Sequence, residues 1–279
     1  MSPKWIKMLI TEFRIPMPFT LDEYQRGQMY TTIQTSLLES SNEEGVEVLK
    51  NEPFSDNADM PEGYSSGDYT KKVYNFANRF PFFIRALAPK SAMQLTEESW
   101  NSFPYTRTIL TNDKMKEDFF IKIDTIYCEG KPEQENAHEL SQDLLDTRKV
   151  VQIDIAKDTL SNAWKRDTPE PSQFTSAEVN RGPLATDWIQ TAEPIMTCYK
   201  LVQVKFKWFG LQRTIESFIM KTERKLFTSF HRCMFVWIDD WFVLTPNQLK
   251  NMENKADKQL SGTPSRGMSR YQTSAYTIK

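Results

Sequence analysis

The stretch YKLVQVKFKW (199–208), with the residues that follow it, decides the fold. Its even positions form an apolar face that begins with a lysine, and its odd positions are mostly polar, the period-two alternation of a half-buried strand. After Gly210 the apolar residues recur every three or four positions, at Leu211, Ile215, Phe218, Leu226, Phe230, Met234, Trp237 and Trp241. This period predicts one helix of roughly 45 Å. We therefore expect a long helix lying across a sheet.

Other segments also alternate between apolar and polar residues. They are MLITEFRI (8–15), EGVEVLKN (44–51), YTKKVYNF (69–76), PYTRTILT (104–111), FFIKIDTIY (119–127) and VVQIDIA (150–156). So many strands with polar turns between them are typical of a single curved sheet. The sequence therefore predicts an α+β fold with a large, mostly antiparallel sheet.

Capping motifs place the remaining helices. Thr20 and Glu23 form a capping box, so a helix of about fifteen residues should follow and end near residues 40–44. TEES (96–99) predicts a shorter helical turn. TPNQ (245–248) combines an N-cap, a first-turn proline and a glutamine, which predicts a last helix ending near Leu260.

Two stretches lack a sustained apolar period. Residues 157–196 carry four prolines, and an excursion of that length is usually functional or disordered. The tail, 263–279, is expected to be mobile or to act as a lid. No clean linker divides the rest, so we expect one domain over 1–262.

Composition excludes several function classes. Lysine and arginine number 35 against 37 acidic residues, and this balance argues against a nucleic-acid binder. No charge-free apolar run approaches the ~20 residues of a membrane span. With 9 glycines, the chain contains neither a dinucleotide-binding fingerprint nor a P-loop. The charged N-terminal stretch is not typical of a secretory signal, so we expect a cytoplasmic protein.

Histidine and cysteine are too few and too dispersed for most catalytic and metal sites. We interpret His231 as a packed or capping histidine and His138 as a surface residue. Cys128, Cys198 and Cys233 do not have the short spacing of zinc ligands, nor do they suit a disulfide framework. We expect no catalytic residue and no metal ion, and the reducing cytosol suits these cysteines.

Threonine and lysine interrupt the apolar faces of the predicted strands. Lys200, Lys72 and Thr125 each share a face with apolar neighbours. One interpretation places these residues at strand ends, where they reach solvent. The other is an enclosed apolar chamber with a polar end, whose hydroxyl and ammonium groups would bind a ligand with an anionic head and apolar tails. Periodicity alone leaves both open.

From about Met8 to Leu260 the sequence closely resembles the phosphatidylinositol transfer proteins, and most closely their small soluble class. The matching segments are DEYQRGQMY (22–30), EGVEVLKNEP (44–53), YTKKVY (69–74), SWNSFPYTRT (99–108), MKEDFFIKI (115–123), NRGPL (180–184), YKLVQVKFKWFGLQ (199–212) and ERKLFTSFHR (223–232). The resemblance implies a START-like helix-grip fold, in which a curved sheet and long helices enclose a single lipid cavity.

The resemblance also implies a role for individual residues. Those matching the family's inositol-binding positions are Thr70, Lys72, Asn101 and Glu253. Those matching the shared phosphate and headgroup region are Gln28, Thr106, Thr108, Thr125, Lys200 and Glu223. Donors and acceptors of these types suit phosphate oxygens and ring hydroxyls. Phosphatidylcholine lacks those hydroxyls, so it would leave the inositol-binding groups unpaired.

Three further positions follow from the same resemblance. Trp208 and Phe209 match an aromatic pair that docks the family on membranes, although many members have two tryptophans there. Ser176 matches a regulatory serine. Thr106 stands where many small members have cysteine, so we expect no sensitivity to thiol reagents at that position.

The resemblance therefore predicts an intracellular lipid transfer protein, not an enzyme. It would exchange one phosphatidylinositol or phosphatidylcholine molecule between membranes, with the phospholipid as cargo and no cofactor. We expect a monomer, transient contact with membranes, and lipid kinases as further partners. Two alternatives stay open: a sensor that presents lipid to a kinase with little bulk transfer, and a helix-grip enzyme acting on a hydrophobic substrate.

Overall fold

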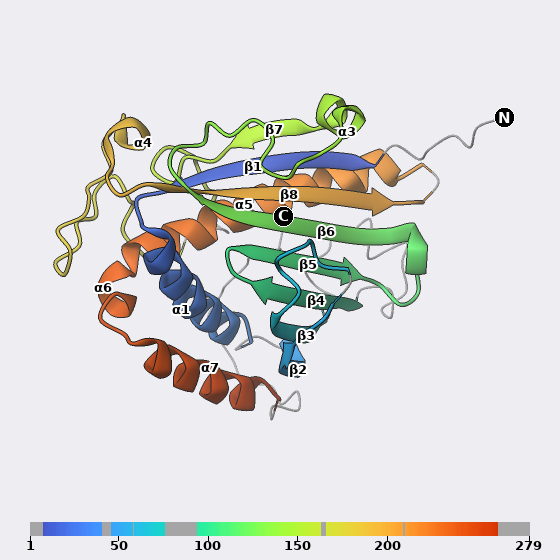
Figure 1. The fold of residues 1–279 in the computed structure, drawn as a ribbon, viewed down its shortest axis with the longest axis horizontal. Helices are drawn as coiled ribbons and strands as arrows, with labels where there is room; N and C mark the ends of the chain where they lie inside the picture. The colour runs from blue at the N-terminus through green and yellow to red at the C-terminus, as the bar shows by residue number, and fades with distance from the viewer. Residues whose placement is uncertain are drawn as a thin grey trace.

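The computed structural model describes residues 8–40, 46–57, 59–75, 94–162, 166–208 and 210–261. In these ranges eight strands form one curved sheet in the order β2-β3-β4-β5-β6-β8-β1-β7 (Figure 1). The strands are β1 (Leu9–Met17), β2 (Val46–Phe54), β3 (Gly67–Asn75), β4 (Gln94–Ser102), β5 (Tyr105–Thr111), β6 (Phe119–Glu129), β7 (Lys149–Gln152) and β8 (Met196–Phe206). The predicted α+β fold with a large, mostly antiparallel sheet is confirmed.

Helices complete the architecture. They are α1 (Leu21–Ser40), α3 (Gln142–Thr147), α4 (Trp188–Thr191), α5 (Gln212–Val236), α6 (Ile238–Trp241) and α7 (Pro246–Ser261), with a 3-10 turn, η2, at Lys116–Asp118. Helix α5 packs along β8 and β1, α1 contacts α5 and α7, and α7 reaches edge strand β2 (Figure 1). The helices α1, α5 and α7 therefore cover one face of the sheet, which we call the inner face.

The capping motifs formed as predicted at two helices. Glu23 N–H donates to Thr20 Oγ1 at 3.2 Å, and Thr20 N–H donates to Glu23 Oε2 at 2.8 Å. Before α7, Thr245 and Gln248 make the equivalent pair of backbone-to-side-chain bonds. These reciprocal bonds satisfy backbone donors that a helix start leaves unpaired.

The structure corrects three sequence predictions. Residues 96–99 belong to β4 and not to a helical turn, because β3 and β5 pair with this segment on both sides. The helix after Gly210 does not run unbroken to Trp241. It ends at Val236, and the separate short helix α6 carries the buried Trp241. Strand β7 ends at Gln152 and pairs parallel to β1, the one parallel pair among the described strands.

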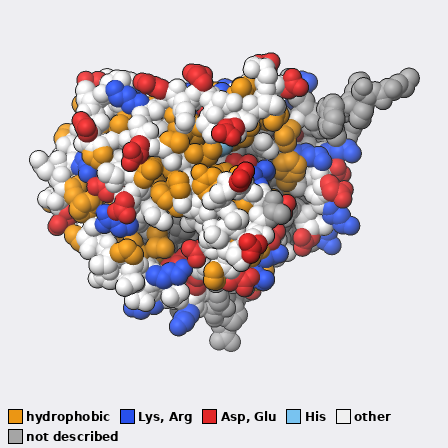
Figure 2. Space-filling model, in the orientation of Figure 1, with side chains coloured by type: hydrophobic (Ala, Val, Ile, Leu, Met, Phe, Trp, Pro, Cys, Tyr) orange, Lys and Arg blue, Asp and Glu red, His pale blue; other side chains and the backbone are white. Residues whose placement is uncertain are grey.

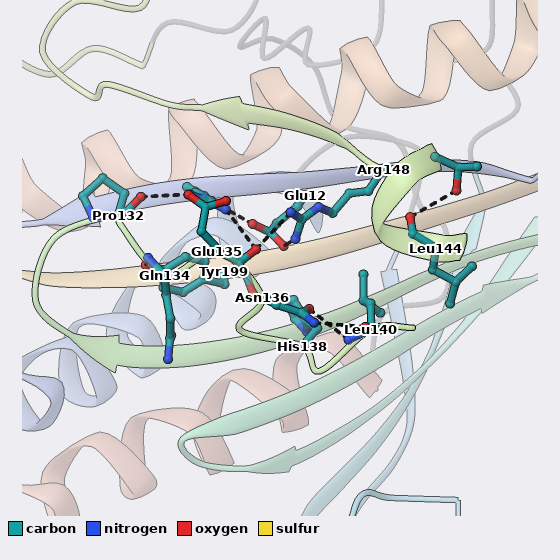
Figure 3. A network of polar contacts seen from close by, with 12 residues as sticks. Glu12, Pro132, Gln134, Glu135, Asn136, His138, Leu140, Leu144, Arg148 and Tyr199 are labelled. Carbon is teal, nitrogen blue, oxygen red and sulfur yellow. Dashed lines mark hydrogen bonds and ion pairs between the residues drawn. The ribbon is translucent and has the colours of Figure 1, made fainter. Parts of the chain in front are cut away.

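The outer face of the sheet is covered near β1 by the segment that precedes β7. Glu12 is fully buried there and pairs with Arg14 at 2.7 Å and with Arg148 at 2.5 Å (Figure 3). His138 lies beside them, half-buried, with Nε2 3.1 Å from the Tyr199 carbonyl oxygen, so its predicted position on the surface is wrong. Burial lowers the pKa of His138. This network fastens the segment before β7 to the sheet.

The excursion at 157–196 is packed against the rest of the fold. Its Leu184, Trp188 and Ile189 belong to the hydrophobic core. Arg181 makes a two-pronged ion pair with Glu23 of α1, at 2.9 and 3.1 Å. These contacts hold the excursion in place against the end of the molecule where α1 begins.

Candidate functional site

The strand register gathers most of the predicted lipid-binding residues on the inner face. Residues paired across neighbouring strands share a face, and three successive rows cross the sheet. They are Lys200, Thr125, Thr106, Asn101 and Asp68; then Val202, Ile123, Thr108, Ser99 and Thr70; then Val204, Ile121, Leu110, Glu97 and Lys72. The register thus places these hydroxyl and ammonium groups on one face of the sheet.

The polarity of the side chains changes along each row. On β6 and β8 the second and third rows are aliphatic, whereas on β3 and β4 all three rows are polar. The polar side chains of these rows on β3, β4 and β5 are half-buried except for Asp68, which is exposed near the start of β3, while their aliphatic counterparts on β8 are buried. An inward-facing side chain keeps accessible surface only where the space beside it is not filled by protein. The inner face therefore offers one polar half with room beside it and one apolar half.

Lys200 stands where the two halves meet. Its Nζ lies 3.3 Å from Thr125 Oγ1 and above the rings of Phe227 and Tyr127, 5.2 and 5.8 Å from their centroids. Its removal from bulk water lowers the pKa of this amine, yet the side chain keeps some accessible surface. A buried cation of this kind requires an anionic partner. Such a cation is suited to bind a phosphate.

Glu223 lies close enough to interact with both Lys200 and Glu97. Glu223 of α5 is buried, and burial together with the nearby Glu97 raises its pKa to about 7, although Lys200 acts in the opposite direction. Glu97 belongs to β4 and accepts a bond from the Tyr74 hydroxyl at 3.2 Å. Helix α5 thus brings Glu223 to the inner face, as the site prediction requires.

Gln28 of α1 and Glu253 of α7 meet the same face. Gln28 Nε2 donates to the Tyr127 hydroxyl at 2.8 Å. Glu253 pairs with Lys250 at 2.8 Å, and Lys250 also lies 3.8 Å from Asp68, the β3 partner of Asn101. All ten predicted headgroup residues therefore lie on the inner face or on helices that meet it.

Sequence reasoning missed two residues of this site. Tyr127 was assigned only to an apolar strand face, but its hydroxyl bonds Gln28 and Thr106 and its ring stacks on Phe103 at 5.1 Å. Glu97 was assigned to a helical turn. Both residues can be recognised once the pairing of the strands is known. Glu97, for example, pairs directly with Lys72 when 96–99 is read as part of β4.

The other predicted functional positions lie away from this cluster. Trp208 is 39% exposed just beyond β8 and stacks on Phe206, with ring centroids 6.3 Å apart. Phe209 falls outside the described residues. Ser176 is buried in the excursion, where its hydroxyl donates to Asp239. Burial alone would raise the pKa of Asp239, but the bonds from Ser176 and two backbone N–H groups lower it.

His231 is packed inside the fold, as predicted. Its Nδ1 lies 2.7 Å from the Phe227 carbonyl oxygen and its Nε2 lies 3.0 Å from the Tyr24 hydroxyl. Nδ1 therefore carries the hydrogen, and Tyr24 donates to Nε2. Burial, assisted by Lys200, lowers the pKa of His231 to about 3. An imidazole with both nitrogens engaged is poorly placed to act as a general base.

The described ranges contain no group of three or more histidine, cysteine, aspartate or glutamate side chains placed to hold a metal ion. No helix in these ranges is both long enough and apolar enough to span a membrane.

Known proteins match this chain over nearly its whole length. The family model described as "Phosphatidylinositol transfer protein" matches residues 8–258. The human phosphatidylinositol transfer protein beta isoform is 40% identical over 266 residues, covering 93% of this chain and 96% of the relative. Phosphatidylinositol transfer protein 1 of Dictyostelium discoideum is 42% identical over 255 residues, covering 91% and 94%. The chain belongs to the phosphatidylinositol transfer protein family.

Proposed function

We propose that this protein carries one phosphatidylinositol molecule at a time between membranes and exchanges it for phosphatidylcholine. The observation that carries the proposal is the division of the inner face into a polar half and an apolar half. A phospholipid has the same division. In this proposal the lipid headgroup lies against β3, β4 and β5, and the acyl chains lie against β6 and β8.

The size of the hydrophobic effect supports a carrier that encloses its cargo. Two acyl chains hold about 30 methylenes, and exposing them to water would cost on the order of 25 kcal/mol. Apolar protein surface must therefore surround the acyl chains for as long as the lipid is outside a bilayer. The same cost disfavours an empty protein, so the lipids should exchange at the membrane surface.

The phosphate binds at the junction of the two halves. Lys200 supplies the cation, and Thr125, Thr106, Thr108 and Gln28 supply donors around it. Glu223, whose pKa is raised to about 7, is easily protonated and can then donate to a phosphate oxygen.

The inositol ring binds one step further along the polar half. Thr70 and Lys72 act as donors from β3, Asn101 acts from β4, and Glu253 accepts from α7. Phosphatidylcholine would occupy the phosphate region but leave these four groups without ring hydroxyls. The selectivity for inositol lipids should thus reside in β3, β4 and α7.

Membrane contact and regulation involve residues that lie away from the inner face. Trp208 and Phe209 insert into the membrane surface, and the charges of both signs on the face in Figure 2 create no strong single-sign field that would hold the protein there. Modification of Ser176 would require the excursion to release it from Asp239. Residues 1–262 act as one domain; the tail, 263–279, lies outside the described residues.

Transfer in this proposal needs no cofactor and no covalent step, because the phospholipid leaves unchanged. The protein works as a cytoplasmic monomer that visits membranes transiently and supplies lipid kinases with substrate. The engaged state of both His231 nitrogens supports a carrier over a helix-grip enzyme.

The test is transfer of labelled phosphatidylinositol from donor to acceptor vesicles by the purified full-length protein. Native mass spectrometry of the protein as isolated should show one phospholipid per chain. Absence of phosphatidylinositol transfer, with phosphatidylinositol also absent from the co-purified lipid, would refute the proposal.

A further inference from the structure

One buried carboxylate, that of Glu216, connects the end of β8 to the start of α5. Glu216 is 5% exposed, and its Oε1 accepts from the Phe206 backbone N–H at 3.2 Å and from Gln212 Nε2 at 3.0 Å. Phe206 is the last residue of β8, and Gln212 is the first residue of α5. A single oxygen therefore binds the chain on either side of Trp208.

The Phe206 N–H lies where the sheet no longer offers it an acceptor. Strand β8 lies between β6 and β1, but within the described residues β1 pairs with it only as far as Val204. Phe206 is buried, and a buried backbone N–H without an acceptor costs free energy. Glu216 thus supplies from a helix the acceptor that a neighbouring strand would supply elsewhere in the sheet.

Phe206 in turn supports Trp208. The two rings stack with an interplanar angle of 6°, and Phe119 contacts the Phe206 ring in a T-shaped arrangement, with centroids 6.2 Å apart. The backbone of Trp208 is held as well, because its carbonyl oxygen accepts from the N–H groups of Leu211 and Gln212 at 3.1 and 3.2 Å. The exposed indole therefore has a defined position on the surface of the protein.

A second contact holds the strand side of this turn. Lys207 N–H donates to the Asp118 carbonyl oxygen at 2.7 Å, and Lys207 Nζ lies 3.6 Å from Asp118 Oδ1. The side chains of this pair are about half exposed, and pairs of this kind contribute little to stability. The buried Glu216 is therefore the side chain whose loss should change the position of Trp208 more.

We propose that Glu216 is a positioning residue for membrane contact, which holds the Trp208 indole in the orientation in which it meets a lipid surface. This inference rests on the proposed function, which assigns docking to Trp208. A side chain that is already fixed loses less conformational freedom when it inserts, and so binds more tightly. Without Glu216, the end of β8 would have to become ordered at each visit to a membrane.

The experiment compares Glu216→Ala with wild type in sedimentation with vesicles made of phosphatidylcholine and phosphatidylinositol. We expect the association constant for vesicles to fall about tenfold, the factor for ordering one residue of backbone. In the transfer assay, the vesicle concentration that gives half the maximal rate should rise by the same factor, while the maximal rate stays near wild type. Glu216→Gln keeps an acceptor oxygen and should restore the association.

A double-mutant cycle separates positioning from general destabilisation. In a Trp208→Ala background, Glu216→Ala should have no further effect, because no indole remains to be positioned. The matched control is Thr228→Ala, which removes a buried hydroxyl that bonds the Arg224 carbonyl oxygen within α5, and it should associate like wild type. A loss that persists without Trp208, or unchanged association in Glu216→Ala, would overturn the inference. Equal association of wild type and Trp208→Ala would instead overturn the docking role in the proposed function.

Gln212→Ala provides the test if Glu216→Ala folds poorly, because Gln212 is half-buried and its loss removes only one of the two bonds to Glu216. Its association with vesicles should fall by a smaller factor than that of Glu216→Ala, and only while Trp208 is present. A folded Gln212→Ala protein with unchanged association, or with an equal loss in the Trp208→Ala background, would contradict the positioning role.

Discussion

Glu12 and Arg148 lie 136 residues apart in the chain, and Arg148 Nη1 meets Glu12 Oε2 at 2.5 Å (Figure 3). Glu12 has no exposed surface, and its other oxygen accepts from Arg14 Nε at 2.7 Å. Arg14 and Arg148 both continue to backbone carbonyl oxygens of the segment before β7. This single carboxylate therefore joins β1 to a segment that the chain reaches only after five further strands of the sheet.

Neutralising Glu12 should destabilise the fold without touching the lipid-binding face. Glu12→Gln leaves two buried guanidinium groups without their counter-charge, which typically costs about 3–5 kcal/mol. Chemical denaturation should show this loss, while the lipid bound to the folded fraction should be unchanged by native mass spectrometry. Glu133→Gln, an exposed site in the same segment, is the matched control. Equal stability of the two variants would contradict the account.

Lys72 and Lys71 are neighbours in β3 that face opposite sides of the sheet. Lys72 shares the inner face with Thr70, whereas Lys71 pairs with Glu98 at 3.5 Å on the outer face. Lys72→Ala or Thr70→Ala should abolish phosphatidylinositol transfer and largely spare phosphatidylcholine transfer. Lys71→Ala should leave both rates near wild type. If Lys72→Ala reduced both transfers equally, β3 would not be the source of selectivity.

The sequence predicted those parts of the fold where local pattern and tertiary context agree. The alternation in 199–208 and the capping boxes at Thr20 and Thr245 each describe a structure that its neighbours also favour. TEES (96–99) shows the opposite case. Its local pattern suits a helix start, but strands on both sides offer it a complete ladder of hydrogen bonds, and the ladder decides.

The candidate site could be predicted residue by residue but not as a network. Family resemblance named Thr106, Asn101 and Gln28 separately. It could not show that Tyr127 lies between Gln28 and Thr106, because that contact depends on where α1 crosses the sheet. Likewise the raised pKa of Glu223 depends on its burial and on Glu97, which comes from a different element.

Glu223 should make the stability of the protein depend on pH. Burial and the neighbouring Glu97 raise the pKa of Glu223 from its usual 4.5 to about 7 against the opposing effect of Lys200. Between these pH values the folded protein holds a proton that the unfolded chain has lost, so this contribution to stability falls as the pH rises from about 4.5 to 7.

Glu223→Gln mimics the protonated acid at every pH. It should match wild type near pH 4.5 and exceed it at pH 8, by on the order of 2–3 kcal/mol in unfolding free energy. Thermal or chemical denaturation across this range provides the measurement. Glu117→Gln, at an exposed site, should show no such gain. A Glu223→Gln variant that was less stable than wild type at pH 8 would show that the carboxylate and Lys200 form a net favourable pair.

Trp208 should govern membrane contact and leave lipid binding intact. It is 39% exposed beyond the end of β8, and its ring is supported from one side by Phe206. An indole at such a position gains free energy at a membrane interface. Trp208→Ala should therefore lower the fraction of protein that sediments with vesicles and slow transfer in proportion. Native mass spectrometry should still show one lipid per chain.

The matched control for Trp208 is Val243→Ala, which also removes an exposed apolar side chain, one that is 59% exposed between α6 and α7. It should leave vesicle association unchanged, because the proposal places docking at the end of β8. Trp208→Phe should fall between alanine and wild type, since phenylalanine keeps the apolar ring but lacks the indole N–H. If Val243→Ala and Trp208→Ala weakened sedimentation equally, membrane contact would depend on general surface hydrophobicity and not on this docking residue.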